Sequence, residues 1–151
     1  MIAVTNQATV RVDIQPSDEG YQWSYSKWNE ETWPENAKLG PHGSVTVPAN
    51  DGPWEVIYKI DSSDYQLFSA LINTNPAAAT RLSDFDQILG LQFDAGNIDG
   101  SSTISTASIF FANTLPVTNP HPVGISFELW ARLTQTRQVI TSSDPQVKNE
   151  M

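Results

Sequence analysis

Five aromatic side chains lie close together near the start of the chain, among amides and carboxylates. They are Tyr21, Trp23, Tyr25, Trp28 and Trp33. Aromatic rings can stack on the apolar face of a sugar while polar neighbours bond its hydroxyls, so this composition suits a carbohydrate-binding surface. The first three alternate with polar residues, which favours a strand packed on a core. Trp28 and Trp33 follow in a segment without periodicity, so they are candidates for a ligand or partner surface.

Trp130 is the third candidate binding residue. It shares one face of an alternating segment with Glu128 and Arg132, and the opposite face of that segment is apolar. A single exposed Trp is ordinary, but a Trp on the outer face of a sheet is also typical of a self-association patch. We therefore expect a homo-oligomer that uses this face.

Signatures of catalysis are missing from the sequence. The chain has no Cys and no Gly-x-Ser-x-Gly motif. The neighbouring carboxylates Asp84 and Asp86 have polar flanks, where carboxyl groups stay solvated. His42 and His121 each lie beside Pro or Gly without a second ligand at metal spacing, so we expect exposed loop histidines. We expect a protein that is not an enzyme, with no catalytic residues and no cofactor.

The segment from Asp94 to Gly100 has some of the residues of a calcium-binding loop. Aligning Gly100 with the invariant glycine of an EF-hand loop puts Ala95 at the first ligand position and Thr106 where a bidentate Glu belongs. The motif therefore fails, and no metal site is predicted. A turn is the simpler interpretation. A looser cation site made of oxygen ligands stays open, and its candidates are Asp84, Asp86, Asp94 and Asp99.

Composition excludes several partners. The formal net charge is -9, with 8 Lys and Arg spread over the chain. Nucleic acids and acidic membranes both require basic surfaces, so neither is an expected partner. No segment has the length of a membrane span, and the first residues have no signal-peptide pattern. Together with the absence of Cys, this predicts a soluble, cytoplasmic protein, and the length of 151 residues predicts a single domain over residues 1–151.

The segment from Ile125 to Leu133 has the clearest structural pattern. Every odd position in it is apolar and every even neighbour is polar or Trp130. This period of two predicts a central β-strand with Phe127, Leu129 and Leu133 buried. The tail from Ser143 to Glu150 is predicted to be a turn followed by a fraying or edge-pairing terminus.

Other segments also indicate strands. They cover residues 2–14, 21–25, 45–47, 54–60, 88–93 and 103–112. The first two are expected to form a hairpin, and the turn at Asn50-Asp51-Gly52 predicts a second hairpin between residues 45–47 and 54–60. Residues 62–73 fit both a helix and a strand, and the surrounding strands favour the strand. The whole pattern predicts an all-β fold, an antiparallel immunoglobulin-like β-sandwich of about seven to nine strands.

The order of segments in the last ninety or so residues resembles a known family. A Tyr-containing apolar strand (Tyr65 to Ile72) is followed by a Ser/Thr-rich strand that runs into Ala112-Asn113-Thr114. The alternating strand from Ile125 to Leu133 and the closing Ser143-Asp144-Pro145-Gln146-Val147 come next. This order is similar to that of the bacterial DP-EP family. The resemblance implies a small immunoglobulin-like sandwich of uncharacterised function, and it implies no catalytic residues. This chain ends Glu150-Met151, where the family would have Glu-Pro.

Two classes of function follow from these residues. The first is a non-enzymatic structural or interaction module that self-associates, which Trp130 and the missing catalytic motifs favour. The alternative is a carbohydrate-binding module with a glycan partner, which Trp28 and Trp33 favour.

Overall fold

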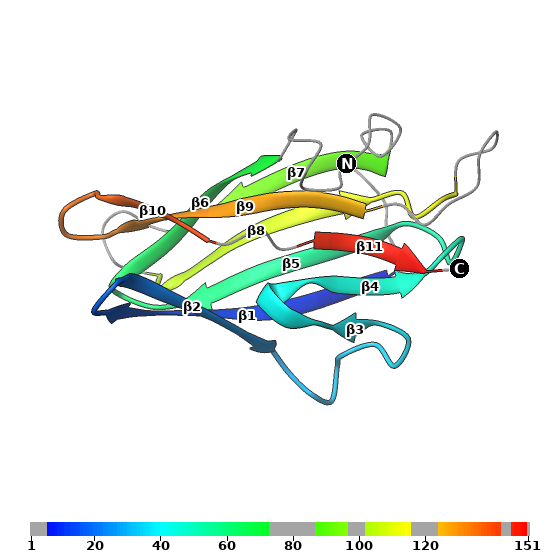
Figure 1. Cartoon of the computed structure of the whole chain (residues 1–151), viewed down its shortest axis with the longest axis horizontal. Coiled ribbons are helices and arrows are strands. Elements are labelled where there is room, and N and C mark those ends of the chain that lie inside the picture. Colours follow the sequence, from blue (N-terminus) through cyan, green and yellow to red (C-terminus); the bar gives the residue numbers. More distant parts are fainter. Residues whose placement is uncertain (1–5, 73–86, 97–101, 116–123, 143–145, 151) are drawn as a thin grey trace.

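The computed structural model describes residues 6–72, 87–96, 102–115, 124–142 and 146–150, and these residues form two β-sheets (Figure 1). The first sheet has the strand order β2-β1-β5-β8-β7. Its strands are β1 (Asn6–Ser17), β2 (Gly20–Lys27), β5 (Trp54–Asp61), β7 (Ile88–Asp94) and β8 (Ile104–Phe111). The prediction of an all-β chain is confirmed for these residues.

The second sheet is organised around one long strand, β9 (Gly124–Leu133). One edge of β9 pairs with β6 (Tyr65–Ile72), and β10 (Val139–Thr141) and β11 (Gln146–Glu150) also pair with it. The sheet continues from β11 to β4 (Val45–Pro48) and β3 (Lys38–Leu39). A 3₁₀ turn, η1 (Pro41–Gly43), joins β3 to β4.

The inner faces of the two sheets form one hydrophobic core. Alternate residues of β1, β5 and β9 are buried, as the period of two predicts. At the centre, the rings of Tyr58 on β5 and Phe127 on β9 meet edge to face, with 5.6 Å between their centroids. Phe127 and Leu129 are fully buried as predicted, but Leu133 is only partly buried because it lies at the end of β9.

The sheets are mixed, so the prediction of a purely antiparallel sandwich is wrong. β1 pairs with β5 in parallel, and β4 pairs with β11 in parallel. Parallel neighbours need a crossover connection, and between β1 and β5 the chain makes it through β2 and then through β3 and β4 of the other sheet. Hydrophobic alternation does not record strand direction, so the sequence could not reveal these pairs.

The predicted hairpin between residues 45–47 and 54–60 is also wrong. β4 and β5 belong to different sheets, and the Asn50-Asp51-Gly52 turn carries the chain from one to the other. Buried Asn113 holds this turn, because its side-chain amide donates to the carbonyls of Pro48 (2.8 Å) and Gly52 (3.1 Å). The sequence therefore predicts the turn correctly, but not the strand that follows it, because bonds from the distant Asn113 hold the turn in place.

Three further segments test the sequence interpretation. Residues 65–72 form strand β6, as favoured, and β2 pairs with β1 as the expected hairpin. The tail is not an edge, because β11 lies between β9 and β4 and its Val147 is fully buried. The described residues hold eleven strands rather than seven to nine, since β3, β10 and β11 are too short to show a period.

Candidate functional site

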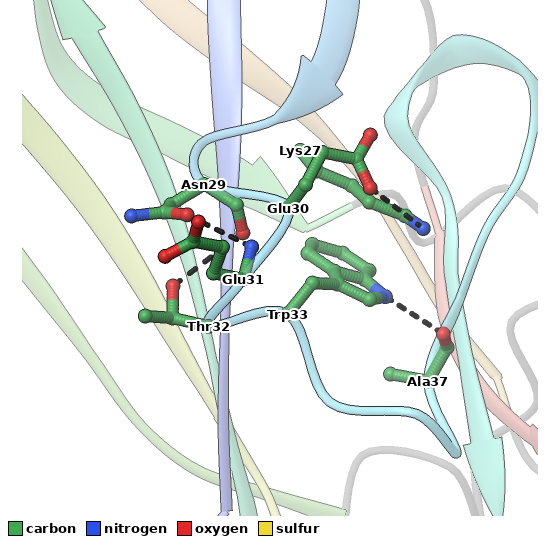
Figure 2. Close-up of polar contacts among 7 residues, drawn as sticks. All are labelled: Lys27, Asn29, Glu30, Glu31, Thr32, Trp33 and Ala37. Carbon is green, nitrogen blue, oxygen red and sulfur yellow. Dashed lines mark hydrogen bonds and ion pairs between the residues drawn. The ribbon is translucent and has the colours of Figure 1, made fainter.

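Trp33 lies in the loop between β2 and β3 and is held there by internal contacts (Figure 2). Its indole Nε1 donates to the carbonyl of Ala37 (2.8 Å), and its ring packs against the core. The Lys27 ammonium lies 5.7 Å from the ring centroid and also pairs with Glu30 at 3.6 Å. These contacts fix the path of the loop, so Trp33 has a structural role that the sequence did not indicate.

The same loop begins with a compact turn around Asn29. The side chain of Asn29 accepts a bond from the backbone N–H of Glu31 (2.9 Å), and its carbonyl accepts one from the backbone N–H of Trp33 (3.1 Å), as Figure 2 shows in part. Such side-chain bonds to the backbone two residues ahead are typical of Asx turns. The loop is therefore ordered by its own residues and presents Trp33 inward.

Trp28 lies on the outer face of the first sheet. The guanidinium of Arg11 is 4.0 Å from its ring centroid and the ammonium of Lys59 is 4.5 Å away. Arg11 and Lys59 are opposite each other on the parallel strands β1 and β5, so they present two cations side by side. The Trp28 ring covers both, and cation–π attraction holds it on the sheet.

A groove of about 270 Å³ opens on this outer face beside Lys59, and we call it the first-sheet groove. Its floor is a row of residues paired across four strands, and the row consists of Thr9, Ile57, Ser108 and Gln92. Glu55 lies on one side of the row, and Lys59, Thr106 and Asp94 lie on the other. Glu55 accepts a bond from the side chain of Gln7 at 2.7 Å, and Asp94 accepts one from the backbone N–H of Gly96 at 2.9 Å.

Trp130 lies on the outer face of the second sheet, where it is partly exposed. Its Nε1 donates to Glu128 at 3.1 Å. Arg132 donates from Nε to Gln66 at 3.1 Å, and its guanidinium lies 5.4 Å from the ring centroid of Phe68. We call this surface the Trp130 face, and it comprises Gln66, Phe68, Leu71, Glu128, Trp130, Arg132 and Val139.

A bulge in β6 places Phe68 on the Trp130 face. The pairing of β6 with β9 shifts between Leu67 and Ser69, so Leu67 pairs with buried Ala131 while Ser69 pairs with Trp130. The extra residue, Phe68, therefore lies on the outer side beneath Arg132. Further along, Leu71 pairs with Glu128 and is 52% exposed, and on β10 Val139 pairs with Arg132 and is 48% exposed.

The three predicted binding residues do not converge on one site. Trp28 and Trp130 lie on the outer faces of different sheets, and Trp33 packs against the core beside the loop. Among the candidate cation ligands, Asp94 lies in the first-sheet groove, while Asp84, Asp86 and Asp99 fall outside the described residues. Within the described residues no three acidic or His side chains are grouped for a metal ion. His42 is exposed in η1, as expected, and His121 is outside the described residues.

Comparison with known proteins finds structural likeness only at a distance. No family model and no curated protein matches the chain. An inclusion body protein (PixA) from Burkholderia cenocepacia J2315 is similar over 98% of both chains, with 9% sequence identity and a TM-score of 0.38. That likeness is too distant for any function to follow from it. In the described part of the chain, no helix has the length and apolar character needed to cross a membrane.

Apart from Asp94, sequence reasoning missed the polar residues of the first-sheet groove. The alternation of β5 does place Glu55, Ile57 and Lys59 on one face, opposite buried Trp54 and Val56. However, the approach of Gln92 and Asp94 depends on the pairing of β7 with β8, which no local pattern indicates. Phe68 was missed for a related reason, because a bulge changes the face of a residue without changing its type.

Proposed function

We propose that this protein is a non-enzymatic interaction module that self-associates through the Trp130 face. The observation that carries the proposal is the arrangement on β9, where Trp130 stands between a carboxylate, Glu128, and a guanidinium, Arg132, each two residues away. Exposed apolar side chains, Leu71 and Val139, flank this group. An aromatic centre with apolar neighbours and a polar surround is the usual composition of a protein interface.

The spacing of the charges supports a second copy of this chain as the partner. Consider a two-fold axis that lies in the interface, runs across the strands and passes Trp130. Such an axis reverses the facing strand, so Trp130 meets Trp130, and Glu128 of each copy faces Arg132 of the other. The same operation brings Leu71 of one copy opposite Gln66 of the other and near its Phe68, since Leu71 pairs with Glu128 and Gln66 pairs with Arg132.

The net charge of the chain makes this local complementarity important. Two copies that each carry a net charge of -9 repel each other over most of their surfaces. Arg132 supplies one of the 8 basic residues, so a face that contains it offers a second copy an attractive contact. Burial of half-exposed Leu71 and Val139 would add apolar stabilisation that does not depend on charge.

Burial explains the raised pKa values of two core tyrosines, so neither shift indicates a catalytic site. Burial raises the pKa of Tyr25 to about 12 and raises that of Tyr58 well above its usual range. Both side chains serve the core: Tyr58 is fully buried and donates its hydroxyl to the carbonyl of Gly43 at 2.7 Å, and Tyr25 packs against the core cluster. Their shifts therefore have a structural cause, since desolvation disfavours the phenolate.

Light scattering across a series of protein concentrations tests the proposal. We expect wild type to show a mass that rises above the 16.7 kDa of one chain, and Trp130→Glu to stay near that value. The matched control is Gln22→Glu, which adds the same charge at an exposed position of β2 and should leave the wild-type mass unchanged. A wild-type protein that stays monomeric at all concentrations would refute self-association.

Charge reversal tests the two-fold arrangement itself. Glu128→Arg alone should weaken association, because it places two cations opposite each other, and Arg132→Glu alone should do the same with two carboxylates. The double variant restores opposite charges in the interface, so its mass should return toward that of wild type. A double variant that associates no better than either single variant argues against this geometry.

We also propose that the domain is an immunoglobulin-like member of the DP-EP family and acts in the bacterial cytoplasm. The segments that carry the resemblance form strands β6, β8, β9 and β11. The stacking of two sheets over one core supports the immunoglobulin-like class. An experimental structure of a DP-EP protein checks the assignment, and a different strand order there would contradict it.

A further inference from the structure

The first-sheet groove lies on the opposite side of the sandwich from the Trp130 face and has a different chemistry. Its eight lining residues include three hydroxyls, one amide, two carboxylates and one ammonium, and a single apolar side chain, Ile57, lies in its floor. Strands β1, β5, β8 and β7 together line an open groove of about 270 Å³, close to the lower end of the volumes found for ligand pockets.

The polar groups of the groove are held in position by other residues. Glu55 is bonded to Gln7 at 2.7 Å, and Asp94 is bonded to the backbone N–H of Gly96 at 2.9 Å. Lys59 lies against Trp28, with its ammonium 4.5 Å from the ring centroid. Each charged side chain that lines the groove therefore has a partner that restricts it, which reduces the entropy lost when a ligand binds.

The charge and polarity of the lining select the class of ligand. Two carboxylates against one ammonium disfavour an anionic ligand, and a lining with Ile57 as its single apolar residue disfavours a purely hydrophobic one. Alternating donors and acceptors match a ligand that has many hydroxyls, each of which both donates and accepts. The indole of Trp28 beside Lys59 adds an aromatic surface at the side of the groove.

We propose that the first-sheet groove binds an uncharged oligosaccharide. Glu55, Asp94 and Gln92 bond its hydroxyls, Ile57 contacts an apolar ring face, and Trp28 borders the bound chain. The floor is a row of residues that crosses four strands, so the groove is open and linear. This form suits a chain of sugars better than a single small molecule, which requires an enclosed pocket. This proposal is independent of self-association, because no residue is shared between the groove and the Trp130 face.

A printed array of uncharged glycans identifies the strongest binder, and titration of the ¹⁵N-labelled protein with that glycan locates the site. We expect saturable shifts at the backbone amides of β5, β7 and β8, with a dissociation constant of about one millimolar, as is usual for an open and solvated site. Failure of every uncharged glycan to bind would overturn the proposal. So would shifts confined to β9 and β10, or binding of charged glycans only.

Variants then test the assigned residues. Gln92→Ala and Trp28→Ala should each weaken binding by at least about fivefold, since each removes a contact with the ligand. Gln92 is exposed on β7, so its replacement leaves folding intact and keeps the test valid if Trp28→Ala proves unstable. The matched control is Gln22→Ala on β2, outside the groove, which should bind as wild type does. Unchanged affinity in both groove variants overturns the assignment.

Discussion

Replacement of Trp33 by Ala should destabilise the protein more than replacement of Trp28 by Ala. The two side chains look alike in the sequence, since both follow the aromatic strand in a segment without periodicity. In the structure Trp33 packs against the core and bonds the carbonyl of Ala37 at 2.8 Å. Trp28 instead lies over Arg11 and Lys59 on the outside of the first sheet. The comparison therefore separates a structural Trp from a surface Trp.

The magnitudes follow from these contacts. Truncation of a fully buried Trp to Ala lowers the free energy of unfolding by about 3–5 kcal/mol. Because Trp33 is only partly buried, we expect roughly half of that loss, about 2 kcal/mol. The lost hydrogen bond to Ala37 adds about 1 kcal/mol, which gives about 3 kcal/mol for Trp33→Ala. Trp28 is also partly buried, but it lies on the outer face of the first sheet and does not pack against the core, so its truncation mainly removes two cation–π contacts at about 0.5–1 kcal/mol each, or about 1–2 kcal/mol in total.

Urea unfolding followed by circular dichroism measures both free energies, at one fixed protein concentration because association would add to the apparent stability. Trp33→Phe serves as an internal control, since it keeps a ring against the core and loses the indole N–H. It should fall between wild type and Trp33→Ala. The reasoning is refuted if Trp33→Ala is as stable as wild type, or if Trp28→Ala is the less stable of the two Ala variants.

Two other predictions concern the core and the turn between the sheets. Burial raises the pKa of Tyr25 to about 12 and that of Tyr58 well above its usual range, so the stability they contribute is fully present below about pH 10 and is lost as pH rises toward 12. In urea unfolding series at alkaline pH, the free energy of unfolding of Tyr25→Phe should fall less steeply with pH than that of wild type. An unchanged slope would contradict ionisation of Tyr25 as a cause of the loss. Asn113 has φ +63 and bonds two carbonyls of the turn. Both Asn113→Gly and Asn113→Ala lose these bonds, but only Gly adopts the positive φ without strain. Asn113→Ala should therefore be less stable than Asn113→Gly by about 1 kcal/mol. Equal melting temperatures of the two variants would refute this backbone argument.

Local alternation was enough to predict most strands of this fold. The patterns of β1, β5 and β9 each place a whole set of apolar side chains on one face, and the structure buries those sets. The reason is physical: the pleat alternates side chains between faces, so one buried face leaves a period of two in the sequence. Strands β3, β10 and β11 carry too few residues for such a period, and the prediction left them out.

Strand order and direction could not be predicted, because they depend on contacts between distant residues. The turn at Asn50-Asp51-Gly52 has the composition of a hairpin turn. However, Asn113, which is distant in the sequence, bonds this turn, and the chain passes through it into the other sheet. The relative placement of the predicted binding residues was hidden from the sequence for the same reason. Trp28 and Trp33 are five residues apart in the sequence, but the partners of Trp28 come from β1 and β5 while those of Trp33 come from its own loop and the adjoining core.

The two proposed surfaces have a joint consequence because they lie on opposite sides of the sandwich. Association through the Trp130 face would cover the outer side of the second sheet and leave the first sheet open to solvent. Each dimer would then carry two first-sheet grooves that face away from each other. Such a dimer can bind two glycan chains at once. Its overall affinity for a glycan-coated surface is then higher than that of one groove, even when each groove binds weakly. Trp130→Glu should therefore leave the affinity for a soluble oligosaccharide unchanged while it lowers retention on a dense glycan surface.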